Sequence, residues 1–173
     1  LRDDFGVYVA GNTEIHFSAG IATQKPGAPI FSIAELAEDA LSAAKQHDGK
    51  DAITCFGETV AWHTWPELEA ALTSLEALRS EMDLSTGFVY SLQQFIDMRR
   101  DEKKGKAEAA MWRSRLAYRT RRFVVDRRRG LTEDERRRHT TRIIQDIGGN
   151  GIETLGPAYR IVLFNHLYQF RDR

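Results

Sequence analysis

Two lysines, Lys45 and Lys50, are the residues of this chain best placed to bind a phosphorylated ligand. They lie at the end of one expected helix and in the turn that follows it, beside an expected strand with small and polar residues on one face. Two cations placed in this way could hold the triphosphate of a nucleotide and offset the charge that builds on a departing pyrophosphate. Lys45 could equally do no more than meet the negative end of the helix dipole.

The strand beside these lysines is expected over residues 14–22. Large apolar residues alternate there with small or polar ones, namely Ile15, Phe17, Ala19 and Ile21 with His16, Ser18, Gly20 and Ala22. This period of two predicts a strand with one packed face. The small residues on its other face could allow a neighbouring helix or strand to pack closely.

A capped helix and a second strand are expected to follow. Ser32 and Glu35 have the spacing of a capping box, and Phe31 and Leu36 that of a hydrophobic staple. Gly49 can provide the left-handed residue after the helix. The second strand is expected over residues 52–56, which completes a βαβ-like half of a small α+β sheet.

The chain of 173 residues is expected to divide near Gly57 into two parts. Residues 1–57 read as a small α/β piece with four basic and eight acidic residues, a balance of −4. Residues 58–173 read as a helical bundle with 21 basic and 17 acidic residues, a balance of +4. Within residues 99–142 there are 17 basic and seven acidic residues, a local balance of +10.

Helix boundaries in the second part are predicted from caps and breakers. Thr64, Ser85 and Thr132 are the expected caps, Thr64 with Glu67 and Thr132 with Glu135 in capping boxes. A third helix is expected over residues 106–128, a flexible turn over 148–151, and a last helix over 152–171 whose regular start Pro157 delays. Four or five helices are therefore expected to pack as a bundle.

Arginines of the third helix and the turn after it are candidates for a nucleic-acid or subunit interface. The set comprises Arg113, Arg119, Arg122, Arg127, Arg128 and Arg129. Clustered arginines neutralise phosphates, but they can also pair with acidic groups of a partner or form a solvated, ion-paired face. Trp112, Tyr118 and Phe123 lie among them and could stack on bases or belong to the core. These alternatives stay open.

Several classes of site find no support in the residues. The single cysteine, Cys55, excludes a disulfide framework, and the five histidines lack metal-ligand spacing, so no metal site is expected. No pair of catalytic carboxylates, nucleophile motif or phosphate loop is present, so no catalytic residue is proposed. No apolar run reaches the length of a membrane span. The expected setting is the reducing cytoplasm, without a membrane partner.

The residues discussed first also carry a resemblance. The run HFSAGIA followed by SIAELAEDALSAAKQHDGKDAITCFG resembles the last third of a GGDEF or polymerase-palm nucleotidyl cyclase domain. There a strand S-x-G-I/V-A precedes a helix that ends A-L-x-x-A-K and a turn with Gly-Lys or Gly-Arg. With FVYSLQQF and AMWRSRLAYRTRR, nearly the whole chain is similar to the large subunit of type III-A CRISPR interference complexes, in which a C-terminal helical domain follows the second palm domain.

This resemblance implies a fold and a function. Residues 1–57 would be the C-terminal half of a palm (ferredoxin-like or GGDEF-like) domain, and residues 58–173 an all-α helical bundle. The parent subunit would convert ATP into cyclic oligoadenylates when target RNA binds, using Mg or Mn on a Gly-Gly-Asp-Asp hairpin, and would cut single-stranded DNA. That hairpin, the first palm domain and the His-Asp nuclease domain are absent from this sequence, so the chain alone is expected to be inert and to bind no cofactor.

Site residues and partners follow from the same resemblance. Lys45 and Lys50 match positions that contact phosphates, and Ser18 matches a serine near the bound adenine nucleotide. The turn is one residue longer than usual and has Lys50 where many relatives have arginine. The implied partners are the other subunits of the complex, small helical ones included, and the guide and target RNAs. The alternatives are a non-catalytic RNA-binding or scaffolding module with a vestigial cyclase half, and an ordinary diguanylate cyclase.

Overall fold

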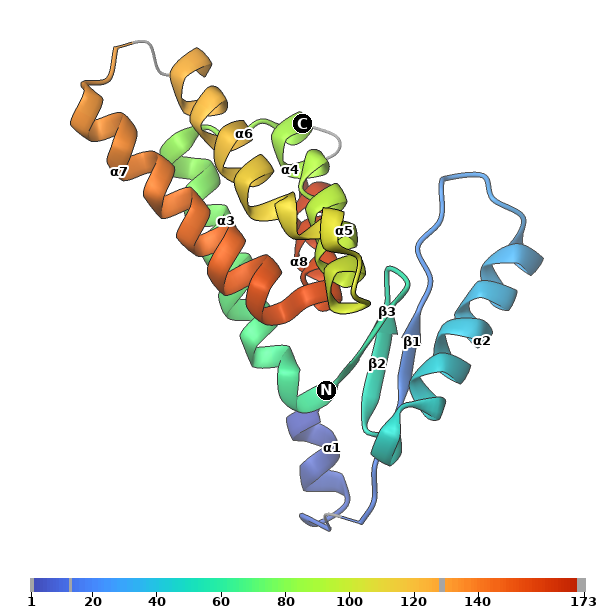
Figure 1. Cartoon of the computed structure of the whole chain (residues 1–173). Helices are drawn as coiled ribbons and strands as arrows, with labels where there is room; N and C mark the ends of the chain where they lie inside the picture. The colour runs from blue at the N-terminus through green and yellow to red at the C-terminus, as the bar shows by residue number, and fades with distance from the viewer. Residues whose placement is uncertain (1, 13, 128–129, 171–173) are drawn as a thin grey trace. The chain divides into compact units, whose positions relative to one another are not determined.

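The computed structural model describes residues 2–12, 14–127 and 130–170, without the side chains of residues 2, 3 and 127 (Figure 1). The chain forms two compact units, residues 1–65 (unit 1) and residues 66–173 (unit 2). Unit 1 holds a small sheet and unit 2 is helical, as the predicted α+β class requires. The division falls after Trp65 and not at Gly57, because a strand that was not predicted follows Gly57 and belongs to the sheet.

Unit 1 is built on a three-stranded sheet. Its elements are α1 (Arg2–Tyr8), β1 (Ala19–Ile21), α2 (Ile30–Gln46), the short turn η1 (Asp48–Lys50), β2 (Ala52–Cys55), β3 (Glu58–Ala61) and the short turn η2 (Trp62–Thr64). The strand order is β1-β2-β3, with β1 parallel to β2 and β2 antiparallel to β3. Figure 1 shows α2 running alongside the sheet. In the chain it connects β1 to the parallel strand β2, so the predicted β–α–β connection is confirmed.

β1 is shorter than the strand expected over residues 14–22. Its ladder with β2 runs only from Ala19, opposite Ile53, to Ile21, opposite Cys55. β2 ends there because Phe56 and Gly57 turn the chain with φ of +52° and +78°, the two positive values of a type I′ hairpin. The packed face predicted from alternation is therefore only partly correct. Ile15 lies outside the ladder and is 48% exposed.

Gly20 allows α2 to approach the sheet closely. A Cβ atom at this position would lie 2.2 Å from the backbone nitrogen of Leu41 and 2.7 Å from the carbonyl carbon of Ala40. Such distances are far below van der Waals contact, so only glycine fits between β1 and the helix backbone. The small-residue face of this strand thus serves close packing at Gly20, which was one of the two readings of the sequence.

The predicted start of α2 is wrong. The helix begins at Ile30 after Pro29, which occupies the cap position, and no side chain caps it. Ser32 already lies inside the first turn, so it cannot form the capping box with Glu35. The staple fails for the same reason, because Phe31 is helical and 76% exposed. The other end follows the prediction more closely, since Gly49 takes a φ of +79° in the turn after the helix.

Unit 2 consists of helices and helical turns. They are α3 (Trp65–Met82, which starts at the boundary), α4 (Thr86–Ser91), α5 (Gln93–Lys103), η3 (Ala107–Met111), α6 (Trp112–Arg127), α7 (Glu133–Ile143), η4 (Ile144–Glu153), η5 (Gly156–Ala158) and α8 (Tyr159–Gln169). Fully buried side chains come from most of them, including Leu78, Ile96, Leu116, Ile143 and Leu163. Across the described ranges, no helix is both long enough and apolar enough to cross a membrane.

Two of the predicted caps in unit 2 are confirmed. The Ser85 side chain accepts a hydrogen bond from the backbone N–H of Phe88 at the start of α4. Thr132 and Glu135 form a reciprocal capping box at the start of α7. Each cap satisfies backbone N–H groups that the first helical turn leaves without partners. Pro157 lies in η5 and delays the last regular helix to Tyr159, as expected.

The turn predicted over residues 148–151 is wrong. These glycine-rich residues belong to the π-helix η4, which continues directly from α7. A Cβ atom on Gly151 would lie 2.6 Å from the ring of Tyr159, and one on Gly148 would lie 3.0 Å from the side chain of Leu116. Gly148 and Gly151 are therefore packing positions, where the absence of a side chain lets Leu116 of α6 and Tyr159 reach the helix backbone. The helix expected from residue 106 likewise begins at Trp112, after the short turn η3.

Candidate nucleotide and nucleic-acid sites

Ser18 and Lys50, two of the predicted nucleotide contacts, lie together in unit 1. The Ser18 hydroxyl donates a hydrogen bond of 2.6 Å to the backbone carbonyl of Lys50. This bond joins the residue before β1 to the residue at the end of η1, so the amino ends of the two parallel strands lie side by side. The proton of Ser18 is used in this contact, and the hydroxyl retains lone pairs that can accept a hydrogen bond.

Lys45 lies at the same end of the β–α–β connection, in the last turn of α2. Lys45 and Lys50 are both exposed, and within the described ranges neither forms an ion pair. Lys50 has a φ of +53°, an unusual conformation for a residue with a side chain. The Ser18 hydrogen bond fixes the backbone of this turn, while both ammonium groups stay accessible to an anion.

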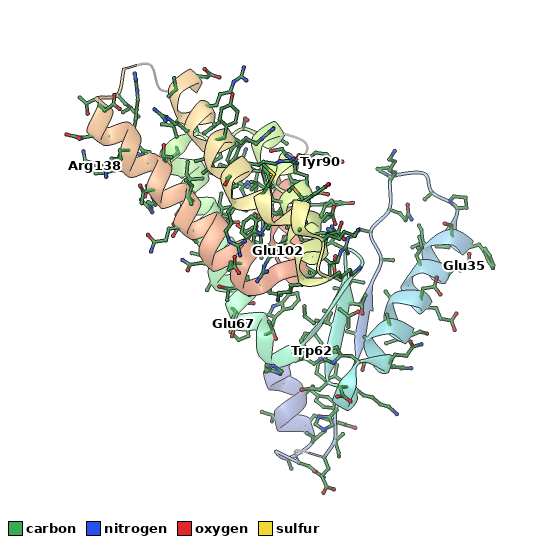
Figure 2. The ribbon with its side chains drawn as sticks, in the orientation of Figure 1. Glu35, Trp62, Glu67, Tyr90, Glu102 and Arg138 are labelled. Atoms are coloured by element: carbon green, nitrogen blue, oxygen red, sulfur yellow. The ribbon has the colours of Figure 1, made fainter. Side chains whose placement is uncertain are left out.

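Trp62 supports this site and was not recognised in the sequence. Its indole N–H donates 2.9 Å to the backbone carbonyl of Phe17, and its backbone N–H donates 3.0 Å to the carbonyl of Asp51. Trp62, which Figure 2 labels, is therefore hydrogen-bonded to the residue before Ser18 and to the residue after Lys50. Its buried ring also packs on Phe17, with ring centres 4.8 Å apart. In the sequence, the one feature that could have drawn attention to Trp62 is its aromatic side chain. Its position directly after β3 could not be recognised, because that strand was not predicted.

A hollow of about 290 Å³ in unit 1 is lined by residues next in sequence to Ser18 and Lys50, namely Phe17 and Asp51. Its lining includes Phe5, Ile15, His16, Phe17 and Asp51. The rings of Phe5 and Phe17 pack 4.7 Å apart at its wall. The hollow thus combines aromatic and aliphatic surface with one carboxylate and one imidazole, a composition that suits a flat, polar-edged ring.

Arg113, the first arginine of the predicted interface, is bound within unit 2. Its guanidinium donates to Glu102 at 2.7 Å and to Glu153 at 2.5 Å. Arg99 pairs with the same two carboxylates at 2.8 and 2.6 Å, and the Trp112 indole N–H donates to Glu102 at 2.9 Å. We call these five residues the Glu102 network. It joins α5, α6 and η4, so the ion-paired reading of the arginine run applies to Arg113.

The charges of the Glu102 network stabilise one another. Hydrogen bonds from Arg113, Trp112 and Arg99 lower the pKa of Glu102 to about 2, and the carboxylates raise the pKa of Arg113. Glu102 is labelled among the helices of unit 2 in Figure 2. Both carboxylate oxygens of Glu102 accept hydrogen bonds, so this carboxylate anchors α5 to α6, while Glu153 joins the same arginines to η4.

The remaining predicted arginines differ from Arg113. Arg119 is exposed and forms no ion pair in the part of unit 2 that the structure describes. Arg122 approaches Asp126 at 3.5 Å, with both side chains more than half exposed. Such pairs contribute little to stability because water screens them. Arg128 and Arg129 lie outside the described residues, as does the side chain of Arg127.

The three aromatic residues of α6 occupy different environments. Trp112 is 1% exposed and belongs to the core, and Phe123 packs on the ring of Phe88 at 4.6 Å. Tyr118 is 68% exposed. The core reading therefore holds for Trp112 and Phe123. Tyr118 alone of the three is open to stack on a ligand, which a helical wheel centred on the buried residues could have shown.

Reactive groups elsewhere are held in neutral, buried form. Burial raises the pKa of the Cys55 thiol to about 11, and burial also raises the pKa of Tyr159. Within the described ranges, no three His, Cys, Asp or Glu side chains gather closely enough to hold a metal ion. The two sites are therefore candidates for binding rather than for catalysis. One presents exposed lysines at the end of α2, and the other presents exposed arginines beside the ring of Tyr118 on α6.

No protein-family model, curated protein or solved structure matches the chain.

Proposed function

We propose that this chain is part of the large subunit of a type III CRISPR RNA-guided complex. Unit 1 contributes contacts to a bound nucleotide, and unit 2 docks onto RNA or neighbouring subunits. The observation that carries the proposal is the hydrogen bond of 2.6 Å from Ser18 to the carbonyl of Lys50. It brings together two segments, 32 residues apart, that the sequence resemblance assigns to one nucleotide site.

Each group of the site has a role in this proposal. Lys45 and Lys50 neutralise the triphosphate of ATP, and the Ser18 hydroxyl accepts a hydrogen bond near the nucleoside. The hollow beside Phe17 receives the adenine ring. Mg or Mn, bound with ATP by the parent subunit, would supply the Lewis acid for nucleotidyl transfer. In unit 1 the acidic residues outnumber the basic ones, so the two lysines are the main attraction for an anion.

The test replaces each lysine with alanine in the intact subunit, assembled with its complex and target RNA. Loss of one charged phosphate contact costs about 1.5–3 kcal/mol, which would raise the ATP concentration for half-maximal oligoadenylate synthesis roughly 10-fold or more. Lys25→Ala is the matched control, because Lys25 is an exposed lysine of unit 1 away from the turn. Unchanged synthesis at low ATP in both Lys45→Ala and Lys50→Ala would remove these residues from the site.

A second candidate is a non-catalytic module that binds RNA through unit 2. The observation that favours it is the face of α6, where Arg119 and Tyr118 are both exposed. The two candidate functions differ in what the variants should do. If the chain is a non-catalytic RNA-binding module, Lys45→Ala and Lys50→Ala would leave every activity of the parent subunit unchanged, while arginine variants of α6 would weaken RNA binding.

A further inference from the structure

We propose that a groove between α5 and α6 binds single-stranded nucleic acid, with Tyr118 stacked on a base and arginines on the flanking phosphates. This deepens, and rests on, the RNA-docking role proposed for unit 2. The open groove has a volume of about 410 Å³, and Phe95 of α5 forms part of its floor. From α6 it is lined by Ser114, Arg115, Tyr118, Arg119 and Arg122.

Arg115, Tyr118, Arg119 and Arg122 form one continuous stripe on α6. They have the spacing i, i+3, i+4 and i+7, which places their side chains in a row along one side of the helix. Thr120 and Val124 lie on the opposite side of the helix, where both are buried. The stripe therefore follows from the same helical period that builds the core, and it presents an alternation of cation, ring and cations to solvent.

Tyr118 is suited to stacking because its ring is not used in the fold. It is 68% exposed, and within the described ranges it packs against no other aromatic ring. An exposed tyrosine can stack with any base, because every base has a π-face. A base inside a duplex is already stacked on its neighbours and cannot reach the ring, so the groove favours an unpaired strand.

The arginines of the stripe are available to phosphates. Arg115 and Arg119 form no ion pair in the described part of unit 2, and the pair of Arg122 with Asp126 is long and exposed. No carboxylate is among the described residues that line the groove. Arg113, on the other side of α6, is already bound by Glu102 and Glu153. Arg115 donates a long hydrogen bond of 4.0 Å to the sulfur of Met98, a weak acceptor. The fold thus separates the structural Arg113 from three arginines whose own contacts are weak enough to be exchanged for phosphates.

A nucleic acid fits this surface better than an acidic protein segment. Carboxylates of a protein could pair with the arginines, but nothing in that chemistry requires an exposed ring between them. A strand of phosphates and bases uses both kinds of side chain at once. The geometry therefore commits Tyr118 to a base and Arg115, Arg119 and Arg122 to the backbone of the same strand.

The experiment measures binding of the complete 173-residue chain to fluorescent 12-nucleotide strands of oligo-uridine and oligo-deoxyuridine, which differ only in the sugar, and to a 12-base-pair RNA duplex. Tyr118→Ala should weaken binding to single strands about 5-fold or more, whereas Tyr118→Phe should retain it, because the ring does the stacking. Arg115→Ala combined with Arg119→Ala should reduce the slope of log affinity against log salt by about 1.4, that is, two phosphate contacts.

Matched controls separate the groove from the general charge of unit 2. Tyr90→Ala removes a tyrosine that is 63% exposed on α4, labelled in Figure 2, and Arg121→Ala removes an exposed arginine of α6 that does not line the groove. Neither should change the affinity for single strands by as much as the groove variants. Circular dichroism establishes that each variant is folded, which is expected because all these side chains are exposed.

Each outcome decides the proposal. Weakened single-strand binding in Tyr118→Ala alone among the tyrosine variants supports it, and the tighter of the two strands identifies the sugar that the groove accepts. Equal binding by wild type and Tyr118→Ala overturns the groove but leaves RNA docking by unit 2 intact. A preference for the duplex that Tyr118→Ala does not alter also overturns it. If neither strand binds at low salt, the RNA-docking role of the chain fails as well.

Discussion

Replacing Gly20 with alanine tests the closest packing contact in unit 1. The added Cβ atom would lie 2.2 Å from the backbone nitrogen of Leu41 and 2.7 Å from its Cα atom. Ordinary contact between such atoms is about 3.5 Å or more, so α2 has to move away from the sheet by over about 1 Å. A backbone cannot rotate out of the way as a flexible side chain can.

The expected cost of Gly20→Ala is about 3 kcal/mol, the upper end of the range for overpacked cores. Cys55 gives a direct assay of this cost, because it is the single cysteine of the chain and is 3% exposed in β2, within unit 1. A thiol reagent reaches Cys55 when the unit opens, so its labelling rate follows the opening equilibrium. A loss of about 3 kcal/mol should accelerate labelling about 150-fold.

Gly6→Ala is the matched control. Gly6 also belongs to unit 1, lies within α1, and has no atom within 4 Å of the position of an added Cβ. Alanine favours a helix over glycine, so labelling of Cys55 in this variant should be unchanged or slower. Labelling of Gly20→Ala at the wild-type rate would refute the close approach of α2 to β1. Complete unfolding of the variant would be the extreme of the expected result, because labelling would then be fastest.

Three further predictions concern unit 2. Gly151→Ala should lower the urea midpoint measured by far-ultraviolet circular dichroism, because the Cβ would lie 2.6 Å from the Tyr159 ring, whereas Gly149→Ala, with open space, should not. Glu102→Gln should lower the thermal midpoint at pH 7, and the difference from wild type should shrink as pH falls from about 4.5 towards 2, where the wild-type carboxylate becomes protonated. Burial lowers the pKa of His166 to about 4, so the unfolded chain takes up a proton at this residue more readily than the folded one. The thermal midpoint should therefore fall as the pH is lowered from 6.5 to 4, and His166→Gln should flatten that part of the profile. Equal midpoints for the two glycine variants, or pH profiles that these substitutions leave unchanged, would contradict the packing and ionisation described here.

Local chemistry predicted several helix ends because caps depend only on neighbouring residues. Ser85 and Thr132 cap their helices as the sequence indicated. Ser32 had an equally good pattern but lies inside α2, because Pro29 and the residues after it already start the helix. The capping-box pattern indicates only that each of two side chains can reach the backbone of the other residue. It does not exclude a helix that begins before the Ser, as α2 does before Ser32.

Features that depend on distant residues were not predictable in this way. Glycines at 148–151 favour a turn by their intrinsic freedom, but contacts with Leu116 and Tyr159 select a π-helix. In the sequence nothing distinguishes Arg113 from the other arginines of α6. Only the fold shows that its guanidinium is ion-paired with Glu102 and Glu153. Of the candidate nucleotide site, the residue types were predictable from the sequence. Its geometry was not, because the hydrogen bond of Ser18 runs to a backbone atom.

The parallel pairing of β1 with β2 has a consequence for how unit 1 forms. Ala19 pairs with Ile53, a separation of 34 residues, whereas β2 and β3 are joined by the two-residue turn at Phe56 and Gly57. Closing a long loop costs more chain entropy than closing a hairpin, so contacts far apart in sequence form late. We expect the β2–β3 hairpin to form first and β1 to join it last, together with α2. During synthesis, β1 therefore cannot pair until the chain beyond Ile53 has left the ribosome. Until then the apolar residues of β1 have no partner strand.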